Sequence, residues 1–212
     1  MFRIAFLAGV AMLVLAGCEK ANVAEHSVPA PVLATPQAVE KKAEALEQNA
    51  AAGNKTVPLA EVIKRPEAQA LDPTGQEPLD DALTCLARTV YWEARGDSEA
   101  SMEAIASVVM NRLGHDGFPD TVCHVVKQGH EQGLCQFSWW CDGRSDSAFE
   151  DDPYKVSKEI ARRALNLQLT DRTGGALYFH QRNVNPSWSA EYIKTVEVGE
   201  FAFYKPHEGD AR

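Results

Sequence analysis

Residues 82–113 read ALTCLARTVYWEARGDSEASMEAIASVVMNRL, and this stretch decides the fold of the chain. In its first part, apolar residues recur at the three- and four-residue spacing of one helix face. These residues are Leu83, Leu86, Ala87, Val90 and Ala94. Gly96 follows at a place where a helix commonly stops. The same spacing continues from Ser98 to Leu113, so the stretch predicts two consecutive helices joined by a short turn.

The rest of this region predicts further helices and then short strands. A short helix is expected from Pro119 through Val126, because proline suits the first turn of a helix. A longer helix is expected from Asp152. Its apolar face would be Val156, Ile160, Ala164 and Leu167. The strand-like segments after Gly174 are 176–180, 194–198 and 201–204. Helices followed by short strands predict an α+β, mainly helical domain over residues 79–206, with a tail at 207–212.

The composition of the 212 residues is uneven. The formal net charge of −9 argues against a nucleic-acid partner, which would require clustered basic residues. No aromatic residue lies between Phe6 and Tyr91, so the intervening chain has little apolar surface to bury. Residues 18–78 are therefore predicted to be a flexible tether, in which 38–52 has only a helix-forming composition. The alternative is an N-terminal extension without a role.

The first residues predict export. Arg3 precedes an apolar run from Ile4 to Leu15, which is long enough for a signal peptide and too short to span a bilayer. The run ends in Leu-Ala-Gly-Cys at 15–18, which resembles the lipobox of bacterial lipoproteins. That resemblance implies a signal peptide at 1–17 and a lipid on Cys18 that anchors the protein to a membrane, facing the periplasm. Glu19 mildly favours the outer membrane. The alternative is an ordinary signal peptide cleaved nearby.

Four cysteines fall within the predicted domain: Cys85, Cys123, Cys135 and Cys141. An even number of cysteines in an exported domain indicates two disulfides, and the sequence leaves three pairings open. A zinc site involving His124 and His130 is the competing interpretation. It is disfavoured because neither a Cys-x-x-Cys pair nor a His-Glu-x-x-His motif is present in the sequence. We therefore expect neither a metal nor any other cofactor.

Glu93 occupies an unusual position for a glutamate. It continues the apolar stripe of the first helix, three residues after Val90, and it stands next to Trp92. Desolvation against apolar neighbours raises the pKa of a carboxyl group, and the negative end of a helix dipole adds to this effect. A carboxyl group that keeps its proton near neutral pH is suited to general acid catalysis. The alternative is a solvated glutamate at a helix end.

Several segments in this order resemble the cell-wall hydrolase family typified by spore cortex-lytic enzymes of the SleB type. They are RTVYWEARGD (88–97), AIASVVMNR (104–112), FPDTVC (118–123), CQFSWWCDG (135–143), GGALYFH (174–180) and PSW (186–188). The resemblance implies a fold similar to that of goose-type lysozymes and lytic transglycosylases. It also implies that Glu93 is the catalytic residue and that peptidoglycan glycan strands are the substrate.

The reaction implied by this resemblance is cleavage of the MurNAc–GlcNAc bond with formation of a 1,6-anhydro-MurNAc end. One carboxyl group suffices, because the C6 hydroxyl of the sugar replaces the water that a hydrolase must activate. Hydrolysis would require a second carboxylate, for which Asp97, Asp142 and Asp146 are candidates. The alternative from another functional class is a peptidoglycan-binding lipoprotein without activity.

Candidate glycan-binding residues lie in two of these segments. Polar contacts could come from Gln136, Ser138 and His180, and flat faces for sugar rings from Phe137, Trp139 and Tyr178. Core packing is the alternative for each aromatic residue. Alternation would place Phe137 with Trp139 in the core, or Ser138 with Trp140, and would put Tyr178 and His180 on one face of a strand.

Two further positions bear on the comparison with the family. Asn111 and Arg112 are expected simply to finish the second helix. Phe201 stands where the family often has a histidine, so a spore-cortex substrate is not implied.

Overall fold

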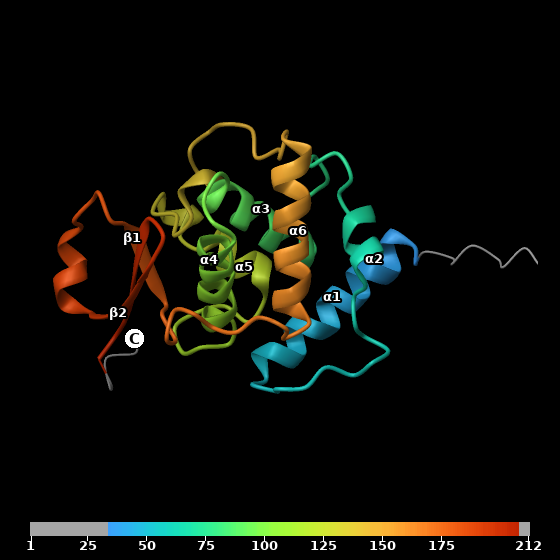
Figure 1. Ribbon diagram of the computed structural model, residues 1–212, viewed down its shortest axis with the longest axis horizontal. Coiled ribbons are helices and arrows are strands. Elements are labelled where there is room, and N and C mark those ends of the chain that lie inside the picture. The colour runs from blue at the N-terminus through green and yellow to red at the C-terminus, as the bar shows by residue number, and fades with distance from the viewer. Residues whose placement is uncertain (1–33, 208–212) are drawn as a thin grey trace, which may run out of the picture. The chain divides into compact units, whose positions relative to one another are not determined.

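The computed structural model describes residues 34–207, in which helices pack together beside one small sheet (Figure 1). The longer helices are α1 (Pro36–Ala51), α3 (Ala82–Ala94), α4 (Glu99–Arg112) and α6 (Asp151–Leu165). The shorter helices are α2 (Arg65–Ala70) and α5 (Val122–Lys127), with 3-10 turns at η1 (His130–Gln132), η2 (Ser138–Trp140) and η3 (Ser187–Glu191). The strands are β1 (Tyr178–Gln181), β2 (Ile193–Val198) and β3 (Phe201–Lys205). The predicted mainly helical α+β fold is confirmed.

Helix α3 forms the centre of the core. It packs against α1, α4, α5 and α6, and every residue from Ala82 to Tyr91 is buried. The helix begins after Asp81, whose side chain accepts a hydrogen bond from the Thr84 backbone N–H at 2.9 Å. The burial ends in the last turn of the helix, where Trp92 and Glu93 are only partly buried.

A tight turn sends the chain from α3 into α4. Gly96 has φ of 87°, a left-handed conformation that favours glycine. Ser98 then caps α4, with its hydroxyl accepting a hydrogen bond from the Ser101 backbone N–H at 3.2 Å. Both helices therefore begin and end within a residue or two of the positions that the sequence predicts.

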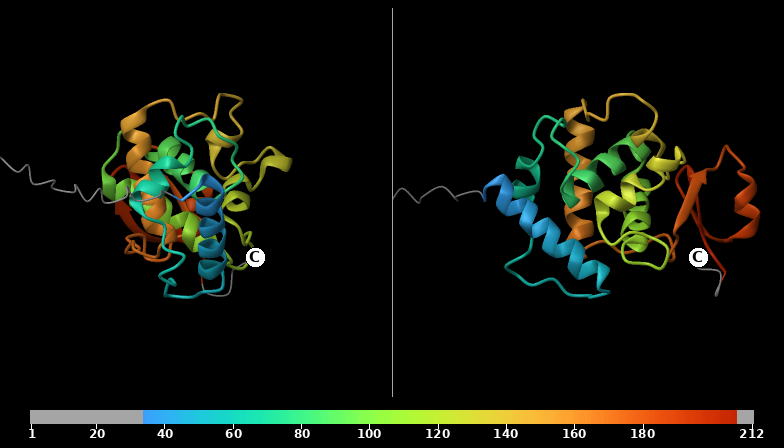
Figure 2. Two further views of the ribbon diagram at one scale, coloured as in Figure 1. Left: turned by 90° about the vertical axis from the view of Figure 1, so that its right-hand side faces the viewer. Right: turned by 180° about the vertical axis from the view of Figure 1, so that it is seen from behind.

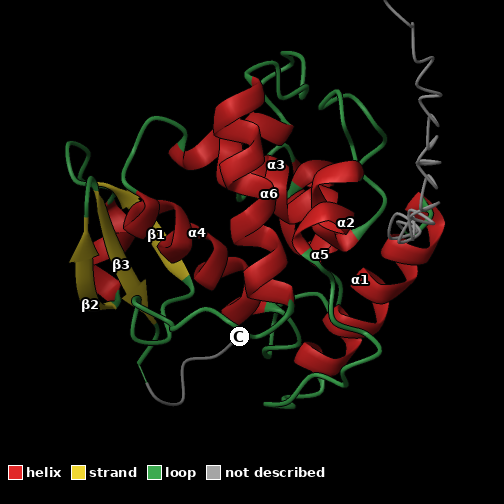
Figure 3. Ribbon diagram, turned by 45° about the vertical axis from the view of Figure 1, so that its right-hand side comes forward, coloured by secondary structure: helices red, strands yellow, loops and turns green. Residues whose placement is uncertain are grey.

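The three strands form an antiparallel sheet in the order β1-β3-β2, beside α4 (Figure 3). β3 pairs with both neighbours, and Phe203 lies opposite Phe179 on β1 and Val196 on β2. Gly199, with φ of 53°, turns the chain between β2 and β3. A Cβ atom there would lie 2.1 Å from the Ser101 hydroxyl of α4, so only glycine allows this approach of hairpin and helix.

The flexible tether predicted for residues 18–78 is wrong over residues 34–78. Helix α1 buries Val39, Ala43 and Leu46, which share one face, against the core of the unit. Figure 2 shows α1 alongside the other helices in two further views. The absence of aromatic residues misled the prediction, because small and aliphatic side chains allow a close approach between helices. At the end of α1, the Ala51 carbonyl oxygen lies 2.6 Å from where a Cβ of Gly114 would stand.

Polar contacts also bind this N-terminal segment to the rest of the unit. The Asn166 side chain accepts a hydrogen bond from the Ile63 backbone N–H at 3.0 Å and donates one to the Ile63 carbonyl at 2.8 Å. The Glu47 carboxylate accepts a hydrogen bond from the Val122 backbone N–H at 2.8 Å, at the start of α5. The predicted signal peptide, Cys18 and the rest of the segment up to residue 33 lie outside the described residues, as does 208–212.

Two helices differ from the prediction in detail. Helix α5 begins at Val122 with Thr121 as its cap, so Pro119 precedes the helix. In α6 the buried face is rotated relative to the predicted stripe, because Val156 is 42% exposed while Tyr154 and Ala161 are buried. Leu167 lies beyond the helix, with φ of 55°. Within residues 34–207, the helices are too short or too polar to cross a membrane.

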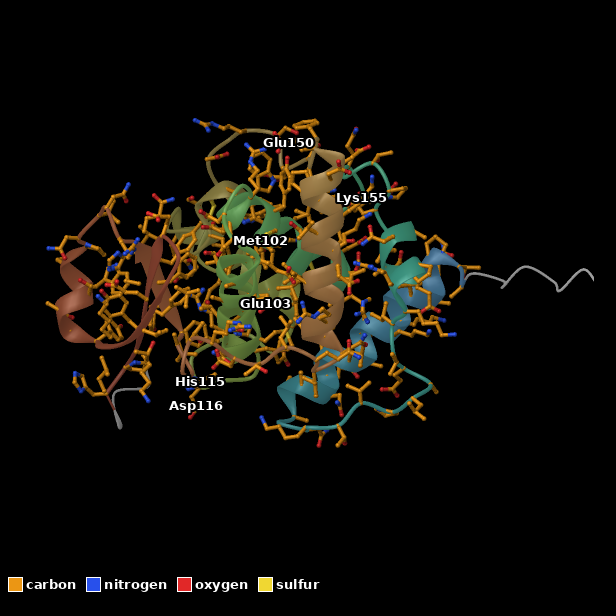
Figure 4. All side chains as sticks on the ribbon, viewed as in Figure 1. Met102, Glu103, His115, Asp116, Glu150 and Lys155 are labelled. Carbon is orange, nitrogen blue, oxygen red and sulfur yellow. A yellow bond between two sulfur atoms is a disulfide. The ribbon has the colours of Figure 1, made fainter. Side chains whose placement is uncertain are left out.

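Ion pairs join α4 to the elements beside it. Glu103, labelled in Figure 4, pairs with Arg163 of α6 at 2.8 Å and with Arg172 after that helix at 3.0 Å. Glu150, at the start of α6 and also labelled, pairs with Arg95 at the end of α3 at 3.6 Å. These pairs connect α6 to α4 and to the end of α3.

Candidate active site

Glu93 lies in the last turn of α3 and is half-buried. Among the described residues, its carboxyl group has no hydrogen-bond donor and no ion-pair partner within 4.0 Å. Burial raises the pKa of Glu93 from 4.5 to about 7, and the positive charge of Arg112 opposes this rise. The desolvated glutamate that the sequence predicts is therefore present, with a proton that can be held or released near neutral pH.

Arg112 is the last residue of α4, and its side chain is buried beside β1. It is only 2% exposed, and its Nε donates a hydrogen bond to the Leu177 carbonyl oxygen at 2.7 Å. Its guanidinium carbon lies 5.2 Å from the ring centre of Phe118, 5.1 Å from that of Phe137 and 5.7 Å from that of Tyr178. Burial lowers the pKa of Arg112 to about 10, while Tyr178 and Glu93 act in the opposite direction.

The interpretation that Arg112 simply finishes its helix is therefore incomplete. The residue does end α4, but its guanidinium also packs against the rings of Phe118, Phe137 and Tyr178, which come from other elements. The available signal was its place in the segment AIASVVMNR, which resembles the family. Asn111 turns elsewhere, because its side-chain amide donates hydrogen bonds to the Ala176 carbonyl at 3.1 Å and to the Thr173 hydroxyl at 3.2 Å.

Tyr178 and His180 share one face of β1, as predicted. Both contact Trp188, with ring centres 6.0 Å and 5.6 Å apart respectively. Tyr178 also contacts Tyr192, at 4.6 Å between ring centres. An imidazole nitrogen of His180 lies 2.9 Å from the hydroxyl of Tyr204. The sheet thus carries a half-buried aromatic cluster that begins at Arg112, where Tyr178 touches the guanidinium.

The prediction that Phe137 and Trp139 offer faces to sugar rings is wrong. Phe137 is 0% exposed and Trp139 is 5% exposed, so both belong to the core. The alternative that Phe137 and Trp139 lie together in the core is confirmed. Ser138 between them is exposed, and Trp140 is only partly buried. Gln136 is exposed as well, so Gln136 and Ser138 stay predictions as polar contacts for a glycan.

The four cysteines form two disulfides in the structure. Cys85 of α3 pairs with Cys123 of α5, with the Cα atoms 5.3 Å apart, and Cys135 pairs with Cys141 across η2, at 6.1 Å. A ring nitrogen of His130 lies 3.3 Å from the Cys141 sulfur, and these three residues form the grouping that most resembles a metal site within 34–207. Because the two sulfurs are bonded to each other, neither is available as a thiolate ligand.

Asp97, Asp142 and Asp146 are the candidates for the second carboxylate that hydrolysis would require. Burial and the charge of Glu200 raise the pKa of Asp97. Burial and the charge of Asp142 raise the pKa of Asp146, while Arg88 opposes this rise. Within the described residues, no carboxylate contributes to the pKa of Glu93. Burial therefore accounts for the raised pKa of Glu93, without repulsion from a second carboxylate among the described residues.

Phe201, at the position of the family histidine, is a core residue. It is buried, and its ring centre lies 5.7 Å from that of Phe179. The largest cleft among those described lies between α1 and α5, has a volume of about 750 Å³ and is lined by acidic side chains of α1. Neither Phe201 nor Glu93 lines it.

Comparison with known sequences places the chain among cell-wall enzymes. The sequence model of the family described as Cell Wall Hydrolase matches residues 96–204, a range that begins just after Glu93. The Spore cortex-lytic enzyme of Halalkalibacterium halodurans is 32% identical over 122 residues, which are 55% of this chain and 33% of that protein. The enzyme of the same name from Bacillus cereus is 29% identical over 138 residues, 63% of this chain and 47% of that protein. The chain thus matches between a third and about half of the length of these curated relatives.

Two solved structures are also similar to this chain. The catalytic domain of the Bacillus cereus SleB protein superposes with a TM-score of 0.48 at 26% identity, covering 58% of this chain and 89% of that one. The catalytic domain of a germination-specific lytic transglycosylase SleB from Bacillus anthracis gives 0.49 at 26% identity, covering 63% and 99%. On the match over residues 96–204, which is half of the sequence, this protein belongs to the Cell Wall Hydrolase family.

Proposed function

We propose that the protein is a lytic transglycosylase that cuts the MurNAc–GlcNAc bonds of peptidoglycan, with Glu93 as acid and then as base. The observation that carries the proposal is the pKa of Glu93, which burial raises to about 7 at the end of the central helix. Family membership supports peptidoglycan as the substrate. The relatives are named spore cortex-lytic enzymes, and we propose ordinary periplasmic peptidoglycan here because residues 4–18 resemble the signal and lipobox of a bacterial lipoprotein.

The reaction needs one group that gives a proton and then takes one. Protonated Glu93 donates its proton to the glycosidic oxygen as the bond from that oxygen to C1 of MurNAc breaks. The Glu93 carboxylate then accepts the proton of the MurNAc C6 hydroxyl as that oxygen bonds to C1 and closes the anhydro ring. The carboxyl group returns to its starting state, and the reaction consumes no water.

The surroundings of Glu93 favour this reaction over hydrolysis. An inverting or retaining hydrolase uses a second carboxylate on the other side of the sugar, about 5–9 Å from the first. Burial is the largest cause of the raised pKa of Glu93, and repulsion by Asp97, Asp142 or Asp146 is not among its causes. Arg112 is the charged group in residues 34–207 that does influence it.

We further propose that the protein is exported and anchored by a lipid on Cys18, with the outer membrane favoured. The support is the sequence alone: an apolar run from Ile4 to Leu15, followed by Ala16, Gly17 and Cys18. A Cys18→Ser variant is expected to move from the membrane fraction to the soluble periplasmic fraction. A variant that stays with the membrane would contradict the anchor.

Digestion of purified peptidoglycan sacculi tests the proposed reaction. The full chain should release products with 1,6-anhydro-MurNAc ends, seen by mass spectrometry, and Glu93→Gln should release at least about 100-fold less, since general acid catalysis supplies about that much. Glu99→Gln is the matched control, because Glu99 has an exposed side chain at the first residue of α4 and should keep full activity.

The products decide between the alternatives. Reducing ends from the wild-type protein would mean hydrolysis, and Asp97→Asn would then show whether Asp97 is the second carboxylate. Equal activity of the wild-type protein and Glu93→Gln would overturn the assignment of Glu93. Binding to sacculi without any products from the wild-type protein would indicate a binding protein.

A further inference from the structure

We propose that His130, Cys135 and Cys141 form a binding site for Zn²⁺, or a divalent cation of the same chemistry, when the bridge between the two cysteines is reduced. The site uses none of the atoms of Glu93, so the inference goes beyond the proposed function and does not depend on it. Two thiolates and one imidazole are ligands that Zn²⁺ prefers in proteins.

The first argument is the distance between the three ligand atoms. A ring nitrogen of His130 lies 3.3 Å from the sulfur of Cys141, and the nitrogen and both sulfurs all lie within 4.8 Å of one another. Zn–S and Zn–N bonds at tetrahedral angles place such atoms about 3.5–4 Å apart. The imidazole therefore already stands at a ligand's distance from Cys141, and after reduction only the two sulfurs must separate.

The second argument is the turn that brings His130 to the cysteines. The Leu134 backbone N–H donates a hydrogen bond to the Gly129 carbonyl at 2.9 Å, and η1 with His130 lies between them. Gly129 has φ of 88°, and a Cβ atom there would collide with the Leu134 carbonyl oxygen, so only glycine allows this closure. The backbone thus holds His130 near Cys135 without help from the bridge.

The third argument is that Cys141 is also held without the bridge. Its backbone N–H donates a hydrogen bond to the Ser138 carbonyl at 3.0 Å, and Phe137 and Trp139 anchor the loop in the core. The bridge closes a loop of only 6 residues, so opening it frees the chain less than opening a longer loop would. We therefore expect the two thiols to stay close together after reduction.

The two bridges of the chain differ in their access to solvent. The side chain of Cys141 is exposed and that of Cys135 is half-buried, whereas Cys85 is 0% exposed. A reductant can therefore reach the Cys135–Cys141 bridge more easily. Within the part of the chain that the structure describes, His130 and these two cysteines are also the one group of three such ligands close enough to share an ion. The buried bridge from Cys85 to Cys123 thus serves as an internal control.

The chemistry balances with a dithiol as the reductant. One thiolate of the dithiol attacks a sulfur of the bridge, and its second thiol then displaces the mixed disulfide. The two cysteines gain two electrons and two protons, and the dithiol is oxidised to a disulfide. When Zn²⁺ binds, each cysteine thiol releases its proton to solvent, the neutral imidazole donates a nitrogen lone pair, and water takes the fourth position. The cation then closes the loop around Gln136 and Ser138 in place of the bridge.

Zinc binding by the untagged full chain, before and after reduction, tests the proposal. The protein is reduced with a dithiol that is then removed without air, and alkylation with peptide mapping shows which bridge has opened. The reduced protein should bind one Zn²⁺ per chain, measured by elemental analysis after gel filtration, and the oxidised protein should bind none. Co²⁺ in place of Zn²⁺ should give the charge-transfer absorption of thiolate ligation.

Variants assign the ligands. His130→Ala should weaken zinc binding by at least about 10–100-fold, since the loss of even an outer-shell partner has that effect. Cys135→Ser with Cys141→Ser should abolish it. His124→Ala is the matched control, because His124 is an exposed histidine of α5 outside this group and its loss should leave zinc binding unchanged.

Two results would overturn the proposal. One is a folded, reduced wild-type protein with free thiols at both cysteines that binds no Zn²⁺. The other is binding that persists unchanged in His130→Ala and in the double serine variant, which would mean an adventitious ion only.

A further variant covers the case in which reduction unfolds the chain, as seen by circular dichroism. Cys135→His cannot form the exposed bridge, keeps the buried one and places two imidazoles beside the Cys141 thiol. It is expected to bind Zn²⁺ without any reductant, and a folded Cys135→His variant that binds none would overturn the proposal in that case. None of these measurements uses glycan cleavage, so their failure would leave the proposed function of Glu93 standing.

Discussion

Glu93 has one pKa in the folded protein and another in the unfolded chain, and this difference couples stability to pH. Burial raises the folded pKa from 4.5 to about 7. Between these two values the folded state holds the proton and the unfolded state has released it, so the unfolded state binds fewer protons. The free energy of unfolding must therefore fall as pH rises from about 4.5 to about 7, by at most about 3 kcal/mol.

A Glu93→Gln variant should not show this fall in the free energy of unfolding with rising pH. At pH 8 the variant is expected to be more stable than the wild-type protein by about 1–3 kcal/mol, and at pH 4 the two should be equally stable. Urea denaturation at both pH values measures the difference. Glu99→Gln, at a more exposed site, should follow the wild-type curve. A Glu93→Gln variant that is less stable than the wild-type protein at pH 8 would contradict the buried, unpaired carboxylate.

For single residues, the sequence predicts those properties that depend on neighbours in the same helix or strand. The raised pKa of Glu93 follows from its place on an apolar stripe next to Trp92, and the structure confirms it. Arg112 could not be assigned in the same way, because its surroundings come from the loop at Phe118 and from β1, distant in sequence. Phe137 posed the same difficulty, since an aromatic side chain fits a core and a sugar equally well.

The disulfides act at the scale of elements. Cys85–Cys123 joins α3 to α5 across 38 residues, whereas Cys135–Cys141 closes a loop of 6. The entropy lost by the unfolded chain grows with the length of the closed loop. The longer bridge should therefore stabilise the protein by about 4 kcal/mol and the shorter one by about 2 kcal/mol.

Replacing each pair of cysteines by alanine separates the two contributions. Cys85→Ala with Cys123→Ala should lower the melting temperature about twice as much as Cys135→Ala with Cys141→Ala. Thermal unfolding followed by circular dichroism gives both values, and the wild-type protein with reductant provides the reference without either bridge. A larger loss from the shorter bridge would mean that strain or packing, and not loop length, governs stability.

Elements with a strong apolar period were predicted almost to the residue. Helices α3 and α4 and the strands β2 and β3 all have both a regular pattern and a glycine at their boundaries. Helix α1 has a weaker pattern, in which Val39, Ala43 and Leu46 carry the buried stripe. Its helical propensity was visible in the sequence, but the surface that it packs on is built by α3 and α6 and cannot be read from residues 36–51 alone.

At the scale of the whole molecule, the N-terminal segment is part of the folded unit. Val39, Leu46, Ile63 and Leu71 are buried, and they come from the region that the sequence predicts to be a tether. Burying each such side chain contributes about 1.5–3 kcal/mol. Their combined gross contribution is at least about 6 kcal/mol, which offsets part of the conformational entropy lost when the segment is ordered. Residues 34–78 are therefore part of the folded unit.

Two leucines of this segment give a matched test of that conclusion. Leu46 is 0% exposed and Leu59 is 93% exposed. If residues 34–78 pack as the structure has them, Leu46→Ala should lower the free energy of unfolding by about 2–5 kcal/mol, while Leu59→Ala should change it by no more than about 0.5 kcal/mol. Urea denaturation measures both, and a chain that starts at residue 79 should fail to unfold cooperatively. If instead that shortened chain melts like the full one, and Leu46→Ala behaves like Leu59→Ala, the segment is a tether after all.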